Sequence, residues 1–265
     1  MASQVELQMP PARMESPLAT RLSLYLDLTY SERDTLRKLT STERHFAAGE
    51  TIATERMPLE TMYVVGSGWL HASNRLPDGA RQILRFYFVG EIATVFALAW
   101  EYTAATLTAV SPCILYEFER TALYDVFRDH PRLGALLYAI GAAEQVAMAD
   151  RLTSIGRTDG VTRIATLLLD IRSRLRAIGE MRGSQFELPL TQQDLGDAVG
   201  LTKTHISRSL KALEQTGLVE RSGRIIRITD VEALSRLVNF DDRHSKIDTS
   251  WIAQPGRAAD SPDQT

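Results

Sequence analysis

The stretch that decides the fold covers residues 190–228, LTQQDLGDAVGLTKTHISRSLKALEQTGLVERSGRIIRI. Thr191 can cap a helix, because its hydroxyl accepts a hydrogen bond from the backbone N–H of Asp194, whose charge suits the positive first turn. Gly200 readily adopts the left-handed conformation that ends helices. Thr202 can then cap a second helix. The stretch therefore predicts two short helices joined by a tight turn.

The second predicted helix has one apolar side and one basic side. Ile206, Leu210 and Leu213 recur at helical spacing and predict a buried stripe. Residues 218–228 resemble the wing hairpin of winged-helix proteins. Between residues 202 and 228, six Lys or Arg accompany two acids, in a chain of net charge −3. Spacing, wing and charge together predict a helix-turn-helix whose second helix enters a DNA major groove; the simpler alternative is a helical hairpin with a solvated polar face.

The predicted DNA-contacting residues occupy the cap positions, the outer face of the second helix and the wing. They are Thr191, Gln192, Thr202, Lys203, Thr204, His205, Ser207, Arg208, Lys211 and Arg224.

Upstream, residues 44–119 consist of short apolar runs separated by turn residues, a pattern typical of an antiparallel β-roll or sandwich. Within it, Pro77, Asp78 and Gly79 predict a hairpin, because Asp-Gly supplies the positive φ that such a turn needs. Residues 132–156 then show apolar side chains at three- and four-residue steps, which predicts one long helix. Because this helix is apolar on more than one face, we expect it to have two packing partners.

Residues 190–214 resemble the helix-turn-helix of the Crp/Fnr superfamily of bacterial regulators, and the resemblance extends over about residues 44–240. It implies an α+β fold with an N-terminal eight-stranded antiparallel β-roll of the cyclic-nucleotide-binding type, a long dimerisation helix and a C-terminal winged helix-turn-helix. The resemblance also implies a homodimer that binds two-fold symmetric double-stranded DNA, with RNA polymerase as a partner if the protein is an activator. The dimer residues would be Leu133, Leu136, Leu137, Ile140, Ala143, Ala147, Leu152 and Ile155.

The expected domain boundaries follow from these patterns. We expect a disordered arm over residues 1–20, a β-roll sensor over 21–130, the dimerisation helix over 131–157, the DNA-binding domain over 158–240 and a disordered tail over 241–265.

Within the recognition helix, Arg208 resembles the arginine that contacts guanine in the family, where it can bond O6 and N7 together. Phosphate contact is the alternative role for Arg208. Thr204 stands where better-studied relatives carry a glutamate, so their operator sequence cannot be transferred unchanged.

The signal-binding features of the best-known relatives are missing. Cyclic-nucleotide binders resemble one another in a Gly-Glu pair followed about ten residues later by an arginine, yet no arginine occurs between Arg85 and Arg120. A buried phosphodiester without a cationic partner is costly, so cyclic AMP is not expected, and Gly90 and Glu91 are interpreted as a turn. The single Cys113 cannot supply an iron–sulfur cluster, and we expect it to be a buried small hydrophobe.

No cofactor or metal is therefore expected, with haem on His45 and His71 kept as a minor alternative. The longest apolar run, residues 133–143, is too short to span a bilayer, and the N-terminus lacks a signal-peptide pattern. A cytoplasmic protein without a membrane partner is expected. We find no catalytic constellation, so the chain is not expected to be an enzyme. Two alternatives stay open: a cyclic-nucleotide-dependent regulator of the same family, and a β-roll regulatory subunit that binds a ligand.

Overall fold

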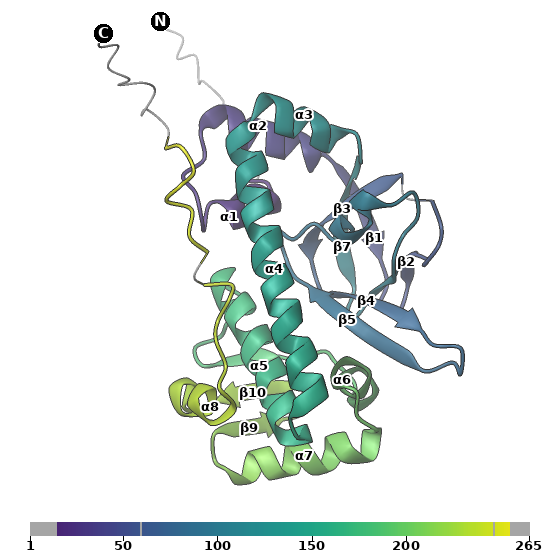
Figure 1. Cartoon of the computed structure of the whole chain (residues 1–265), viewed down its shortest axis with the longest axis vertical. Coiled ribbons are helices and arrows are strands. Elements are labelled where there is room, and N and C mark those ends of the chain that lie inside the picture. The colour runs from purple at the N-terminus through teal and green to yellow at the C-terminus, as the bar shows by residue number, and fades with distance from the viewer. Residues whose placement is uncertain (1–14, 59, 246, 255–265) are drawn as a thin grey trace, which may run out of the picture.

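The computed structural model describes residues 15–58, 60–245 and 247–254 of the 265-residue chain. The long helix α4 (Pro131–Arg157) forms a spine, with the strands of the sensor on one side of its upper half and a small helical domain at its lower end (Figure 1). This arrangement confirms the predicted α+β class.

The sensor begins with two helices, α1 (Pro17–Leu22) and α2 (Tyr30–Leu39). Ser16 caps α1 by accepting a hydrogen bond from the backbone N–H of Ala19 at 3.3 Å. The prediction of a disordered arm over residues 1–20 is therefore wrong for residues 15–20, and residues 1–14 lie outside the described residues. Proline at the first position of α1, together with the Ser16 cap, explains why so short a helix forms here.

Seven strands of the described residues form the roll, as two antiparallel sheets with the orders β1-β7-β3 and β2-β6-β4-β5. Their bounds are β1 (Thr42–Phe46), β2 (Thr51–Ala53), β3 (Thr61–Ser67), β4 (Leu70–Arg75), β5 (Arg81–Tyr87), β6 (Thr106–Ala109) and β7 (Cys113–Glu119). The resemblance implied eight strands; after the turn at Gly90, Ile92 contributes only an isolated bridge to Val64. The predicted hairpin joins β4 to β5, and Gly79 there has a φ of +85°.

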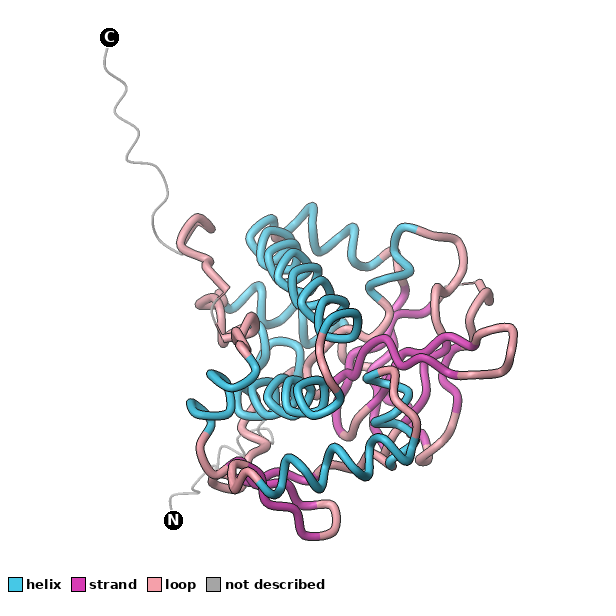
Figure 2. The backbone as a smooth tube through the Cα atoms, turned by 60° about the horizontal axis from the view of Figure 1, so that its bottom comes forward, coloured by secondary structure: helices cyan, strands magenta, loops and turns pink. Residues whose placement is uncertain are grey.

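A 3-10 helix, η1 (Val95–Ala99), follows that bridge, and α3 (Ala122–Asp129) leads into α4. The small domain comprises α5 (Gly160–Ala177), β8 (Gln185–Glu187), α6 (Gln192–Val199), α7 (Lys203–Gln215), β9 (Val219–Ser222), β10 (Ile225–Ile228) and α8 (Val231–Val238). Strands β8, β10 and β9 form an antiparallel sheet beside one end of α7 (Figure 2). The winged helix-turn-helix topology is thus present.

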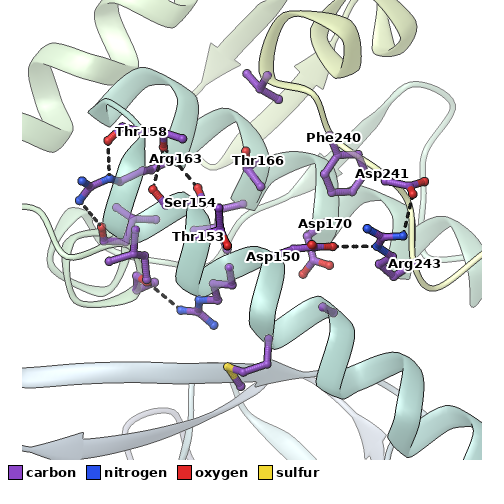
Figure 3. A pocket seen from close by; sticks show the side chains of 18 of the residues that line it. Asp150, Thr153, Ser154, Thr158, Arg163, Thr166, Asp170, Phe240, Asp241 and Arg243 are labelled. Carbon is purple, nitrogen blue, oxygen red and sulfur yellow. Dashed lines mark hydrogen bonds and ion pairs between the residues drawn. The ribbon is translucent and has the colours of Figure 1, made fainter.

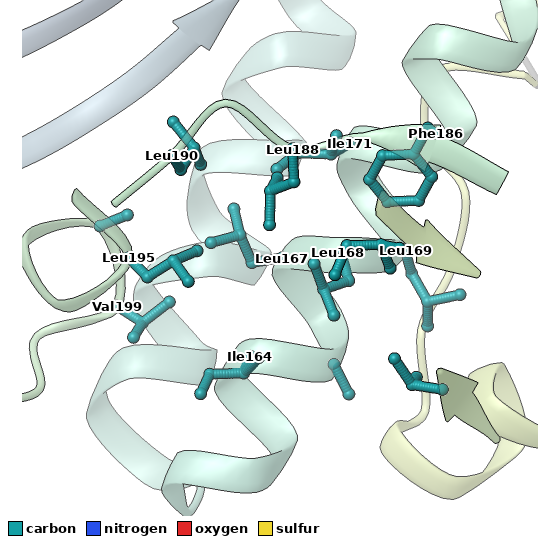
Figure 4. Close-up of a cluster of buried hydrophobic side chains, with 14 of the residues drawn as sticks. Ile164, Leu167, Leu168, Leu169, Ile171, Phe186, Leu188, Leu190, Leu195 and Val199 are labelled. Carbon is teal, nitrogen blue, oxygen red and sulfur yellow. The ribbon is translucent and has the colours of Figure 1, made fainter. Parts of the chain in front are cut away.

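The core of the small domain is continuous with part of the sensor. Ile164 and Leu168 of α5 lie in the buried cluster shown in Figure 4. Residues of α6 and β8 belong to the same cluster. The same cluster includes the sensor residues Trp69, Phe86 and Phe88. Burial of apolar surface therefore holds the two domains together in addition to their polar contacts.

After α8 the chain turns back along α4 toward the N-terminal helices (Figure 1). His244 and Ile252 are buried, and Ile252 joins the N-terminal core. The Tyr25 hydroxyl donates to the His244 carbonyl at 3.2 Å, and Thr249 donates to the Tyr25 carbonyl at 2.6 Å. The predicted disordered tail over 241–265 is thus wrong for the described residues 241–245 and 247–254; residues 255–265 lie outside them.

Candidate nucleic-acid interface

The turn between α6 and α7 is built as its residues predicted. The Thr191 hydroxyl accepts from the backbone N–H of Asp194 at 3.1 Å, and Asp194 in return accepts from the backbone N–H of Thr191 at 2.9 Å. Gly200 ends α6 with a φ of +68°. A Cβ atom on Gly196 would lie 2.5 Å from the Leu201 carbonyl oxygen, so only glycine allows this close approach.

Helix α7 presents its polar side to solvent. Ile206, Leu210 and Leu213 are buried, which confirms the predicted stripe. Of the predicted DNA-contacting residues, Gln192 is half-buried and the others are exposed: Thr191, Thr202, Lys203, Thr204, His205, Ser207, Arg208, Lys211 and Arg224. The structure therefore gathers the second-helix residues on one accessible face and places Arg224 at the tip of the β9–β10 hairpin.

Two of these residues have a structural task as well. The hydroxyl of Thr191 is engaged in the α6 cap, and that of Thr202 accepts from the backbone N–H of His205 at 3.4 Å to cap α7. Substituting either residue would therefore disturb the helix ends as well as any DNA contact.

The basic charge of this region is partly neutralised within the domain. Arg221 pairs with Glu214 at 2.9 Å, and Arg227 pairs with Glu220 at 3.5 Å. The count of charges in the sequence could not show this pairing. Four exposed basic residues remain without a carboxylate within 4.0 Å among the described residues: Lys203, Arg208, Lys211 and Arg224.

The predicted dimer stripe is largely internal to the protomer. Leu133 and Leu136 are fully buried, and Leu137 and Ile140 pack against the same core, which α1 and α2 also line. Of the other predicted residues, Ala143, Ala147 and Ile155 are half-buried and only Leu152 is exposed. The prediction is wrong for Leu133 and Leu136, because the most apolar stripe of a two-faced helix packs against the core of its own protomer.

A different side of α4 is open to solvent. Tyr138 and Leu152 have 78% and 72% of their surfaces exposed, and Val146 and Met148 are exposed as well. Ala142, Gln145 and Ala149 are exposed on this part of the helix. A Cβ atom on Gly141 would meet no atom within 4 Å. Helical glycine costs stability, and no contact among the described residues of the protomer requires it at this position.

The sensor contacts the helix-turn-helix directly. Arg81, at the start of β5, bonds Asp194 at 2.5 Å and Asp197 at 2.6 Å, both on α6. Arg151 of α4 donates to the carbonyls of Ile83 at 2.8 Å and Ala198 at 2.7 Å, so it bridges β5 and α6. Sequence analysis missed these contacts, because their partners lie 47 or more residues apart.

A cavity of about 650 Å³ lies between α4, α5, β5 and residues 238–244 (Figure 3). Asp150, Asp170, Asp241 and Arg243 point into the part shown at the right of the figure. Arg243 pairs with Asp150 at 2.7 Å and with Asp241 at 2.8 Å. Burial alone would raise the pKa of Asp170, but the hydrogen bond from His244 and the charge of Arg174 hold it below its ordinary value. The polar groups of this cavity are thus largely occupied by one another.

The candidate effector residues of the sensor are placed separately. His45 is exposed on β1 and pairs with Glu43 at 2.7 Å, whereas His71 is buried on β4, 3.3 Å from an Arg81 nitrogen. Cys113 is buried, as predicted, and burial raises the pKa of its thiol to about 11. Among the described residues no group of three or more His, Cys, Asp or Glu side chains could hold a metal ion.

A β-roll joined through a long helix to a winged helix-turn-helix defines a transcription regulator that carries its sensor and its DNA-binding domain on the same chain. The comparisons with known proteins agree with this class. Residues 43–130 match the cyclic nucleotide-binding domain, and residues 162–237 match the Crp-like helix-turn-helix domain. The chain belongs to the Crp/Fnr family of bacterial transcription regulators.

Individual relatives support this assignment. The nitrogen fixation regulation protein FixK of Azorhizobium caulinodans is 31% identical over 72% of this chain and 77% of its own. The transcriptional activator protein FnrA of Stutzerimonas stutzeri is 28% identical over 82% of this chain and 88% of its own. The solved structure of FixK2 from Bradyrhizobium japonicum superimposes with a TM-score of 0.66 at 28% identity, covering 74% of this chain and 96% of that one. Within the described residues, no helix has the length and hydropathy needed to cross a membrane.

Proposed function

We propose that this regulator acts as a cytoplasmic homodimer that binds a two-fold symmetric operator through α7. The observation that carries the proposal is the exposed outer face of α7, where Lys203, Arg208 and Lys211 stand without a neutralising carboxylate among the described residues. Regulators of this family bind DNA and act as dimers. If the protein is an activator, RNA polymerase is its further partner.

The exposed side of α4 is the surface that fits a second copy of this chain. Its large apolar side chain Tyr138 stands one turn from the small residues Gly141 and Ala142, and Leu152 stands one turn from the small residue Ala149. Small residues on this side let another helix approach closely. Exposed apolar surface of this kind on a regular helix favours self-association. Two-fold pairing of α4 would give the two recognition helices the symmetry of a palindromic site.

Arg208 is proposed as the main base-reading residue. Its position on the exposed face leaves the guanidinium free to bond O6 and N7 of a guanine. Thr204 precedes it by one turn and offers a methyl group to a thymine rather than a carboxylate to a cytosine. We therefore expect an operator that differs from the site read by relatives with glutamate at this place.

The signal does not arise from cyclic AMP or an iron–sulfur cluster in this proposal. Glu91, in the Gly-Glu turn, is already bonded by arginines of the chain itself. Haem is not favoured either, because His45 and His71 belong to strands of different sheets and each already has a polar partner. The effector of the sensor, if there is one, has a different chemistry.

The experiment that tests the function is selection of bound sequences from random duplex DNA with the full-length protein. Enrichment of an inverted repeat with half-sites about 34 Å apart is expected. Recovery of no enriched sequence, at low and at moderate salt, would contradict the proposal.

A further inference from the structure

Glu91 is surrounded by three arginines from three different parts of the chain. Its Oε1 lies 2.8 Å from Arg21 of α1, and its Oε2 lies 2.5 Å from Arg174 of α5 and 3.3 Å from Arg85 of β5. Only 6% of the surface of Glu91 is exposed. Arg85 also pairs with Glu144 of α4 at 2.6 Å. One buried carboxylate therefore connects the N-terminal helix, the sensor sheet and the DNA-binding domain.

The turn that carries Glu91 is covered by α1. Gly90 has a φ of +80°, and a Cβ atom there would lie 2.6 Å from both the Arg21 Cβ and the Pro17 carbonyl oxygen. Helix α1 thus packs directly on the backbone of this turn, which only glycine permits. The family's Gly-Glu pair is retained here, but its surroundings are filled by the chain itself.

Arg174 attaches the DNA-binding domain to the same turn by two further contacts. Its guanidinium donates to the Phe86 carbonyl at 3.0 Å and lies 4.5 Å from the centroid of the Phe88 ring. Arg174 has only 4% of its surface exposed. Burial alone would raise the pKa of Glu91, but Arg174, Arg21 and Arg85 hold it below its ordinary value. Removing one member of such a buried set leaves an uncompensated buried charge. Loss of any one member is therefore expected to disrupt the whole contact.

We propose that Glu91 is a positioning residue for DNA binding, which acts through Arg174 to fix α5, and with it the helix-turn-helix, against the sensor. The inference rests on the DNA-binding function proposed above. In this arrangement arginines of the chain itself hold the turn, so the domain keeps its orientation without a small molecule there. Without the contact, the domain samples several orientations, and operator affinity falls in proportion to the fraction of molecules that remains in the binding-competent orientation.

The experiment compares Glu91→Gln, Arg174→Gln and the double variant in the full-length protein, using the operator recovered by selection. Each single variant is expected to lose about tenfold or more in affinity, with an unchanged dependence on salt, because the DNA contacts themselves are intact. The double variant should be no weaker than the worse single one, since both changes break the same contact. Glu117→Gln, which removes the partner of exposed Arg44 within the sensor, is the matched control and should bind normally.

A spectroscopic readout separates loss of positioning from loss of folding. Trp69 lies in the core that spans both domains, with its ring 4.7 Å from that of Phe88. When the exposed Trp100 and Trp251 are replaced by Phe, Trp69 is the only tryptophan left in the sequence, so the tryptophan fluorescence reports on this core alone. Its emission should shift to longer wavelength in the Gln variants while the far-ultraviolet circular dichroism stays native.

If Arg174→Gln does not fold, Arg174→Lys, which keeps the charge, is the second variant; it should show an intermediate affinity and emission. Unchanged or increased operator affinity in folded variants, with unchanged Trp69 emission, would overturn the inference while leaving the proposed function intact. Failure of the unmodified protein to enrich any duplex would overturn both.

Discussion

Arg81 of the sensor hairpin and Asp194 of the first helix of the helix-turn-helix form an ion pair with an Nη2–Oδ1 distance of 2.5 Å. The same guanidinium bonds Asp197 at 2.6 Å. The sensor therefore holds the DNA-binding domain by α6, and the outer face of α7 stays exposed. Contact with the supporting helix lets the sensor control orientation without covering the surface proposed to read DNA.

Replacing Arg81 should destabilise the protein more than replacing an arginine of a surface pair. Arg81→Ala leaves two partly buried carboxylates without their partner, so the free energy of unfolding should fall by about 2 kcal/mol. Arg44→Ala removes an exposed arginine whose single contact, with Glu117, has a distance of 3.6 Å, and it should change the free energy of unfolding by less than about 0.5 kcal/mol. Urea denaturation of both variants measures the difference, and equal effects would show that the Arg81 contact adds nothing to folding.

A charge on the exposed face of α4 should weaken the dimer. Leu152→Glu places two like charges at a two-fold contact and removes apolar area, so dissociation should rise at least tenfold at equal protein concentration. Leu237→Glu on α8 is the control, because Leu237 is exposed but lies outside α4. Sedimentation of the DNA-free protein gives the two constants. A monomeric unmodified protein at micromolar concentration would refute the proposed interface.

Cyclic AMP should not bind with useful affinity. The roll offers no arginine between Arg85 and Arg120 for the cyclic phosphate, and Glu91 is already bonded to three arginines of the chain. Calorimetric titration should show no saturable heat at micromolar ligand. Saturable binding in that range would favour a cyclic-nucleotide-dependent regulator instead.

The buried histidine of β4 should make stability depend on pH. Burial and, to a lesser extent, the positive charge of Arg81 lower the pKa of His71 from 6.5 to about 4. The negative charges of Asp194 and Asp197 oppose this shift without cancelling it. In the folded protein His71 stays neutral until the pH approaches 4, whereas in the unfolded chain it binds a proton near pH 6.5. The contribution of neutral His71 to stability is therefore complete above pH 6.5, and the free energy of unfolding falls by about 3 kcal/mol as the pH falls toward 4.

The measurement for this prediction is the free energy of unfolding of His71→Gln against pH. The variant should lose that part of the pH dependence, whereas His45→Gln, at an exposed site, should retain it. Identical pH profiles for the unmodified protein and His71→Gln would mean that His71 titrates normally in the fold.

The elements predicted correctly are those whose signals are local. Thr191, Gly200 and Thr202 each act within four residues of their own position, so the helix-turn-helix could be predicted residue by residue. Asp78 and Gly79 likewise define the β4–β5 turn on their own.

The features that sequence analysis missed depend on distant partners. Arg21, Glu91 and Arg174 resemble solvated surface charges in the sequence, yet each is buried because the others compensate it. Periodicity showed that α4 has several apolar faces but not which one its own protomer covers. Burial of Ile252 depends on its packing against the core of the N-terminal helices, which no local pattern reveals.

The most direct test of the account is the operator preference of Arg208→Ala, measured on a panel of single-base variants of the selected duplex. A base-reading arginine predicts a loss of about 1 to 3 kcal/mol per half-site and relaxed preference at one base pair. Arg236→Ala, an exposed arginine on α8, should leave both affinity and preference unchanged. If Arg208→Ala weakens all duplexes equally, keeps every base preference and lowers the salt dependence, Arg208 contacts phosphate, and the assignment of α7 as a helix that reads bases through this residue is contradicted.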